Sequence, residues 1–220
     1  MTSIIDLSFR VCGNNVPLDH GYLLYSSLSR LAPYLHEADW LGIHPISGIP
    51  TSPNRLALTP RSRLRLRLPA ENIAKFIELA GKRLSLSNGN DRNTITIGVP
   101  EIHSLKPASD LFSRYVTIKL SEVEKTEHSP TREMFLSAIK TQLDSINVRG
   151  EIWIDDARDS YGREYSRRVI EIKHKTVVCY SVYIRDLSEN DSLQLQTHGI
   201  GGRRRMGCGI FIPAKVKETS

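Results

Sequence analysis

The stretch RSRLRLRLPAENIAKFIELAG, residues 61–81, is the part of the sequence that decides the fold class. Its first part alternates arginine with leucine, and an apolar residue at every second position is typical of a strand with one buried face. Pro69 ends this pattern, and the apolar residues of segment 70–80 then recur at helical spacing until Gly81. Glycine is common just past the C-terminus of a helix. A strand followed directly by a helix predicts a mixed α and β chain.

The neighbouring segments extend this pattern over the first half of the chain. Residues 4–12 alternate as a strand, and Asp19 is a good N-cap for a helix whose leucines at positions 24, 28, 31 and 35 share one face. Residues 83–86 and 94–99 have strand character. Segment 40–60 is rich in Pro, Gly and Ser, so we interpret it as a loop or short hairpin.

The second half repeats the arrangement of the first. Its predicted strands and helices are, in order, strand 115–120, helix 131–146, strand 148–154, strand 169–173, strand 176–185, helix 188–196 and strand 210–216. Each half is therefore close to β-α-β-β-α-β. We predict an α+β protein of two tandem ferredoxin-like, RRM-like domains, one over residues 1–107 and one over residues 108–220.

Charge and cysteine content narrow the class of partner. The chain has 30 Lys and Arg against 24 Asp and Glu, a net charge of +6, which favours a polyanionic partner such as nucleic acid. Its three cysteines are far apart and lack the spacing of a zinc site or a disulfide framework. No apolar run approaches the ~20 residues needed to cross a bilayer. We expect a cytoplasmic protein with no metal, no other cofactor and no membrane partner.

A glycine-rich loop near the C-terminus, GIGGRRRMGCG over residues 199–209, is the most informative segment for function. Its glycines and arginines are Gly199, Gly201, Gly202, Arg203, Arg204, Arg205, Gly207 and Gly209. Glycine lets backbone N–H groups approach a ligand closely, and three consecutive arginines add positive charge, so the loop suits a phosphate backbone. The spacing is neither that of a P-loop nor that of a dinucleotide fingerprint. The alternative is a flexible surface loop with solvated arginines.

This loop, placed just before the last predicted strand, resembles the C-terminal glycine-rich loop of the CRISPR-associated precursor-crRNA endoribonucleases, the sixth Cas family of the RAMP superfamily. Segments 16–22 (VPLDHGY) and 33–37 (PYLHE) resemble the beginning of the same enzymes. The resemblance implies metal-independent cleavage on the 3′ side of a repeat hairpin, by attack of the ribose 2′-OH, giving a 2′,3′-cyclic phosphate and a 5′-OH. It implies precursor and mature crRNA, and other Cas effector subunits, as partners.

The resemblance also points to catalytic residues. His36 occupies the position of the family's general acid/base after the first helix, and histidine titrates in the useful range. His44 is the second candidate, since the chain can fold back to the same site. The partner of the histidine stays open between Tyr25 and Ser29, which share a helix face at i, i+4. No lysine lies near His36 in the sequence, so Arg30 is a candidate for the positive charge.

Two further groups of arginines are predicted to contact RNA. The first is a row that projects from one face of a strand and consists of Arg61, Arg63, Arg65 and Arg67. The second, Arg167 and Arg168, lies at the predicted hairpin of the second half and is suited to hold the repeat stem. The alternative for the row is an ordinary solvated strand face.

The main rival is a subunit that binds repeat RNA within a CRISPR effector complex without cutting it. His36 distinguishes the two functions, because a protein that only binds needs no titrating group beside the scissile phosphate. A DNA-binding regulator is disfavoured because the sequence has no helix-turn-helix pattern or basic zipper.

Overall fold

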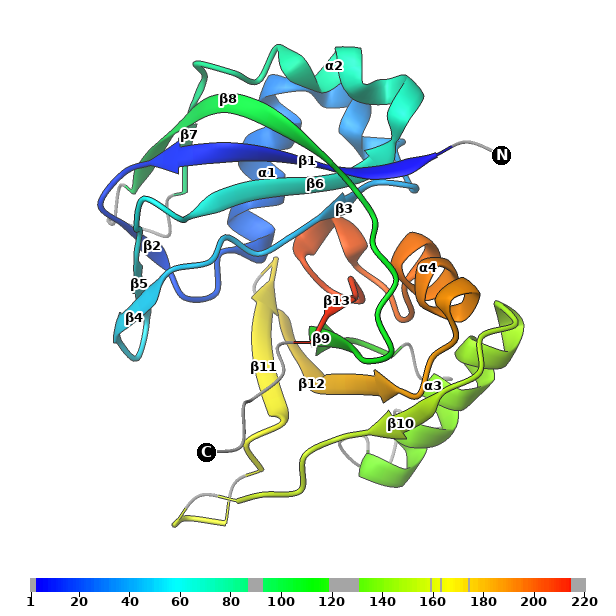
Figure 1. Ribbon diagram of the computed structural model, residues 1–220. Helices are drawn as coiled ribbons and strands as arrows, with labels where there is room; N and C mark the ends of the chain where they lie inside the picture. The colour runs from blue at the N-terminus through cyan, green and yellow to red at the C-terminus, as the bar shows by residue number, and fades with distance from the viewer. Residues whose placement is uncertain are drawn as a thin grey trace. The chain divides into compact units, whose positions relative to one another are not determined.

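The computed structural model describes residues 3–86, 93–118, 131–158, 160–162, 164–173 and 175–214 (Figure 1). The chain divides into two compact units. The first consists of Met1–Leu105 with Arg205–Gly207, and the second of Lys106–Arg204 with Cys208–Ser220. Three residues of the glycine-rich loop therefore belong to the first unit. None of the described helices has the length and hydropathy needed to cross a membrane.

The first unit is built on a five-stranded antiparallel sheet in the order β3-β6-β1-β8-β7. Its elements are β1 (Ile4–Cys12), α1 (Gly21–Leu31), the 3₁₀ helix η1 (Pro33–His36), β3 (Gly42–Ile43), β6 (Arg63–Pro69), η2 (Ala70–Asn72), α2 (Ile73–Ile77), β7 (Arg83–Ser85) and β8 (Thr94–Ser104). A small sheet joins β2 (Asn15–Pro17), β5 (Arg55–Ala57) and β4 (Ile49–Ser52). The strands β1, β3, β6 and β8, with α1 and α2 between them, give the ferredoxin-like arrangement.

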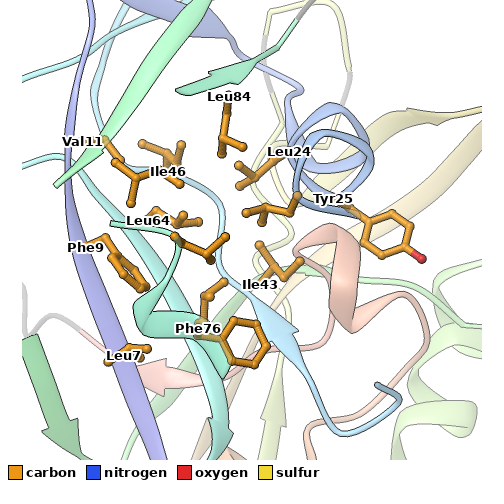
Figure 2. Packing of buried hydrophobic residues seen from close by; sticks show 14 of the residues in the cluster. Leu7, Phe9, Val11, Leu24, Tyr25, Ile43, Ile46, Leu64, Phe76 and Leu84 are labelled. Carbon is orange, nitrogen blue, oxygen red and sulfur yellow. The ribbon is translucent and has the colours of Figure 1, made fainter. Parts of the chain in front are cut away.

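Alternation along the strands decides where the core of this unit lies. Leu7 and Phe9 of β1 point to the same face as Leu64 of β6, and α1 and α2 cover that face with Leu24 and Phe76 (Figures 1 and 2). All five side chains are fully or almost fully buried. Tyr25 belongs to the same cluster, but its hydroxyl is directed away from it (Figure 2).

The second unit repeats the order that the four strands β3, β6, β1 and β8 have in the first unit. Its elements are β9 (Leu111–Val116), α3 (Arg132–Ser145), β10 (Glu151–Trp153), β11 (Arg167–Ile172), β12 (Lys175–Arg185), α4 (Glu189–His198), η3 (Arg204–Met206) and β13 (Ile212–Pro213). The sheet runs β10-β12-β9-β13, and β11 also pairs with β12. Thr131 and Ser188 cap α3 and α4 by accepting backbone N–H bonds. The predicted fold class, α+β with two ferredoxin-like domains, is confirmed.

Several predicted boundaries differ from the observed ones. The strand predicted at 115–120 lies at 111–116, and residues 119 and 120 are outside the described part. In the segment interpreted as a loop or short hairpin, 40–60, β4 and β5 form an antiparallel hairpin, as one of the two alternatives predicts. The segment also contains β3, a two-residue strand at the edge of the first sheet that shows no alternating pattern. The closing strand predicted at 210–216 is only Ile212–Pro213, and residues after 214 are not among those described.

Candidate functional site

The corner between α1 and η1 brings two of the predicted catalytic side chains together. Helix α1 ends at Leu31, Pro33 begins η1, and His36 is the last residue of that turn. The Tyr25 hydroxyl on α1 shares a hydrogen bond of 3.0 Å with Nδ1 of His36, and the two rings meet edge to face at 5.9 Å. His36 is exposed, and its Nε2 has no hydrogen-bond partner among the described residues. One ring nitrogen is therefore hydrogen-bonded to a protein hydroxyl, and the side chain as a whole is exposed.

Arg205 is the cation at this corner. Its Nη1 donates to the backbone carbonyl of Leu35 at 2.9 Å and to that of His36. Its guanidinium carbon lies 5.6 Å from the centre of the Tyr25 ring, and its Nη2 is 3.4 Å from Oδ1 of Asp39. The sequence makes Arg30 the candidate for this charge and predicts that Arg205 contacts RNA. No sequence signal joins Arg205 to His36, because 169 residues separate them.

Ser29, the other predicted partner of the histidine, lies in a different environment. Its side chain is 5% exposed, and its hydroxyl has no hydrogen-bond partner among the described residues. Among the described residues, Tyr25 is the hydrogen-bond partner of the His36 imidazole. The shared helix face of Tyr25 and Ser29 therefore does not bring both hydroxyls to the imidazole.

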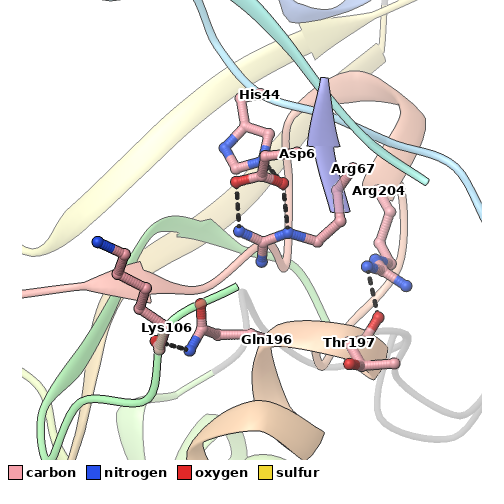
Figure 3. Close-up of polar contacts among 7 residues, drawn as sticks. All are labelled: Asp6, His44, Arg67, Lys106, Gln196, Thr197 and Arg204. Carbon is pink, nitrogen blue, oxygen red and sulfur yellow. Dashed lines mark hydrogen bonds and ion pairs between the residues drawn. The ribbon is translucent and has the colours of Figure 1, made fainter. Parts of the chain in front are cut away.

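His44 is buried in a polar cluster on the first sheet, together with Asp6 and Arg67 (Figure 3). Arg67 donates from Nε and Nη2 to the two carboxylate oxygens of Asp6 at 2.8 and 3.0 Å, and His44 Nε2 lies 3.5 Å from Asp6. Burial, with the charge of Arg67 acting in the same direction, lowers the pKa of His44 to about 4. Burial alone would raise the pKa of Asp6, but the nearby His44 and the two hydrogen bonds from Arg67 hold it well below the usual range. His44 is thus a neutral, enclosed imidazole at neutral pH.

The predicted row of exposed arginines on β6 is only partly exposed. Arg61 is exposed, Arg63 and Arg65 are half-buried, and Arg67 is 1% exposed. The prediction is wrong at Arg67, because this face of the sheet is buried at that end of the strand and the guanidinium is bound by a carboxylate. In the second unit, Arg167 and Arg168 on β11 are both exposed.

The glycine-rich loop uses its backbone N–H groups within the second unit. Gly201 donates to the side-chain oxygen of Gln142, Gly202 to the carbonyl of Thr117 at 3.1 Å, and Gly209 to the carbonyl of Tyr115 at 2.6 Å. The expectation that the loop's glycine amides face a ligand is wrong for these three groups. Their glycines allow close backbone packing, and these three N–H groups already have acceptors within the protein.

The three arginines of the loop have different surroundings. Arg203 is exposed, with a left-handed backbone at φ +64°. Arg204 donates to the carbonyl of Thr197 at 2.9 Å, near the C-terminal end of α4 (Figure 3). Arg205 holds the turn that carries His36. Of the three, Arg203 is the one whose side chain is open to a phosphate.

A matched pair of substitutions tests the packing role of the glycines. Gly201 has φ +81°, and a Cβ there would collide with the carbonyl oxygen of Thr117, whereas at Gly202 the nearest atom would be 3.9 Å away. We expect strain in Gly201→Ala to lower the free energy of unfolding by about 1 kcal/mol or more, which lowers the midpoint of unfolding in urea. Gly202→Ala should leave the midpoint nearly unchanged. Equal midpoints for the two variants would contradict this assignment.

Comparison with known proteins shows which protein family this chain is related to. A family model described as Cas6 Crispr matches residues 5–216 of the chain. A curated protein of Myxococcus xanthus, "CRISPR-associated endonuclease Cas6", is 37% identical over 216 residues, which are 95% of this chain and 81% of that protein. Among solved structures, a "CRISPR associated protein Cas6" has a TM-score of 0.65 at 13% identity, over 98% of this chain and 100% of the other.

A second solved structure contains RNA. "CRISPR endoribonuclease Cse3 bound to 19 nt RNA" has a TM-score of 0.51 at 14% identity and covers 97% of this chain and 100% of the other. At these identities, the two solved structures bear on the fold alone.

Proposed function

This chain belongs to the Cas6 family of CRISPR-associated endonucleases, and on that premise we propose that it binds CRISPR repeat RNA and cuts precursor crRNA on the 3′ side of the repeat hairpin. The observation that carries the proposal is the exposed imidazole of His36, oriented through Nδ1 by Tyr25. A group that only binds RNA needs no such orientation, whereas proton transfer does.

The reaction we propose uses the ribose 2′-OH as nucleophile and no metal ion. The 2′ oxygen bonds to the adjacent phosphorus, the bond from phosphorus to the 5′ oxygen breaks, and the products are a 2′,3′-cyclic phosphate and a 5′-OH. One proton leaves the 2′-OH and one reaches the departing 5′ oxygen. We assign His36 Nε2 to one of these transfers as general acid/base, with Tyr25 holding the ring at Nδ1.

The test is incubation of the protein with end-labelled repeat RNA in EDTA. A single cut that yields a 2′,3′-cyclic phosphate, and that a 2′-deoxy nucleotide at the cut site prevents, supports the proposal, because the nucleophile is then missing. Cleavage that survives the 2′-deoxy substitution, or that EDTA abolishes, indicates a water-using metal nuclease. Tight binding of the RNA with no cut indicates the rival function, a non-catalytic subunit of a CRISPR effector complex.

If repeat RNA is the partner, the side chain of Arg203 should contribute to the affinity for it. The exposed guanidinium is suited to neutralise a phosphate, so Arg203→Ala is expected to weaken repeat binding and to reduce the slope of log K against log salt by about 0.7 to 0.9, the value for one phosphate. Filter binding from 50 to 300 mM KCl measures the slope. Arg204→Ala is the matched control, since that guanidinium already contacts the carbonyl of Thr197. The same loss of slope in both variants would contradict the distinction.

A further inference from the structure

The side chain of Arg205 contacts both members of the Tyr25 and His36 pair. It donates to the carbonyls of Leu35 and His36, and its guanidinium lies near the Tyr25 ring. We propose that Arg205 is a positioning residue for the cleavage reaction, which holds His36 and Tyr25 in the arrangement that proton transfer requires. This inference rests on the proposed function and changes the role of Arg205 from an RNA contact to a support of the acid/base residue.

The acceptor groups explain why a cation stabilises this turn. The carbonyls of Leu35 and His36 lie at the C-terminal end of η1, where backbone oxygens lack helical partners and carry partial negative charge. One guanidinium nitrogen binds both carbonyls, and the other approaches the carboxylate of Asp39 at 3.4 Å. Two neighbouring peptide groups are thereby fixed to one rigid, planar group.

The Tyr25 contact fixes the other partner of the hydrogen bond. A guanidinium within about 6 Å of an aromatic ring centre is attracted to the ring face, and the distance here is 5.6 Å. The same side chain thus limits movement of the ring that orients Nδ1 and of the backbone that carries the imidazole. Its side chain is 26% exposed, and both of its terminal nitrogens already contact oxygens of the protein, which leaves little of it for a phosphate.

The backbone of the segment is held independently of the Arg205 side chain. Gly207 adopts φ +84°, and a Cβ there would lie 2.9 Å from Cγ of Pro45. Gly21, the first residue of α1, lies so close to the carbonyl of Met206 that a Cβ would collide with it. Removing the guanidinium should therefore free the His36 turn without detaching residues 205–207, so Arg205→Ala is expected to fold.

The experiment compares Arg205→Ala, Arg205→Lys and Arg203→Ala in single-turnover cleavage at saturating repeat RNA, with affinity measured separately. We expect Arg205→Ala to lower the rate about 10 to 100-fold, since small misplacements of a reacting group cost this much, and to change Kd less than about 2-fold. Arg205→Lys keeps the charge but loses the planar fork, so it should recover only part of the rate. Arg203→Ala should instead weaken Kd, as expected of a side chain that contacts a phosphate.

A double variant tests whether Arg205 acts through His36. If it does, Arg205→Ala adds no further loss of rate in a His36→Ala background, because the group being positioned is absent. Independent losses that multiply would overturn the proposal. So would an Arg205→Ala protein that binds RNA weakly but cuts at the normal rate when saturated, which would make Arg205 an RNA contact.

Hydrogen exchange of the RNA-free protein separates this inference from the proposed function. We expect the amides of residues 34–39 to exchange about 10-fold faster in Arg205→Ala than in wild type, with no change in Arg203→Ala. Wild-type protein that fails to cut RNA would refute the proposed function while this measurement still reports on the turn. Unchanged exchange, whether or not wild type cleaves, would refute the positioning role.

Discussion

Replacement of His36 by alanine is expected to lower the single-turnover rate of repeat cleavage by about 10²-fold or more, while Kd for the repeat stays within about 2-fold. General acid/base catalysis typically contributes 10² to 10⁴-fold, and the predicted phosphate contacts lie on other residues. Rapid mixing of excess protein with labelled repeat RNA gives the rate, and filter binding with a 2′-deoxy repeat gives Kd without cleavage.

Two other histidines serve as controls for this measurement. His103→Ala removes an exposed imidazole on β8 and should leave rate and affinity unchanged. His44→Gln removes the buried imidazole beside Asp6 and should affect stability more than the rate for folded protein. Loss of cleavage in His44→Gln, with normal cleavage in His36→Ala, would give the acid/base role to the later histidine.

The second large effect is expected on stability. Arg67→Ala leaves the Asp6 carboxylate, 7% exposed, without its bidentate partner, and removal of one member of a buried ion pair typically costs about 3 to 5 kcal/mol. We expect a corresponding fall in the free energy of unfolding, measured in urea at pH 7.5. Substituting both residues, Asp6→Leu with Arg67→Met, should recover part of the loss, because no buried charge then remains.

Arg63→Ala on the same strand is the matched control. Its side chain is half-buried and donates to the carbonyls of Pro60 and Ser62, and such a change typically costs about 1 kcal/mol. If Arg63→Ala and Arg67→Ala were equally destabilising, the buried ion pair would not be the source of the effect.

Local patterns in the sequence were sufficient for the fold class. The alternation in β1 and β6 is present in the residues themselves, since side chains of a strand alternate between two faces whatever lies around it. The helices α1 and α3 follow from apolar spacing, and Ser188 caps α4 as predicted. The N-cap predicted for α1, Asp19, is wrong, because the helix begins one residue later with His20 at the N-cap and no side-chain cap bond. Short edge strands such as β3 were missed, because two residues carry no period and form only by pairing with β6.

What the sequence by itself determined is which residue types share a face or a segment: the leucines of β6 opposite its arginines, a histidine just after the first helix, and glycines next to arginines near the C-terminus. Only the tertiary structure decided what each side chain contacts. Periodicity predicts a face but not its burial, so Arg61 is exposed while Arg67 on the same row is enclosed by Asp6. Three adjacent arginines are equivalent in the sequence, yet Arg205 binds the turn of His36 because chain folding, which no local pattern encodes, brings together residues 169 positions apart.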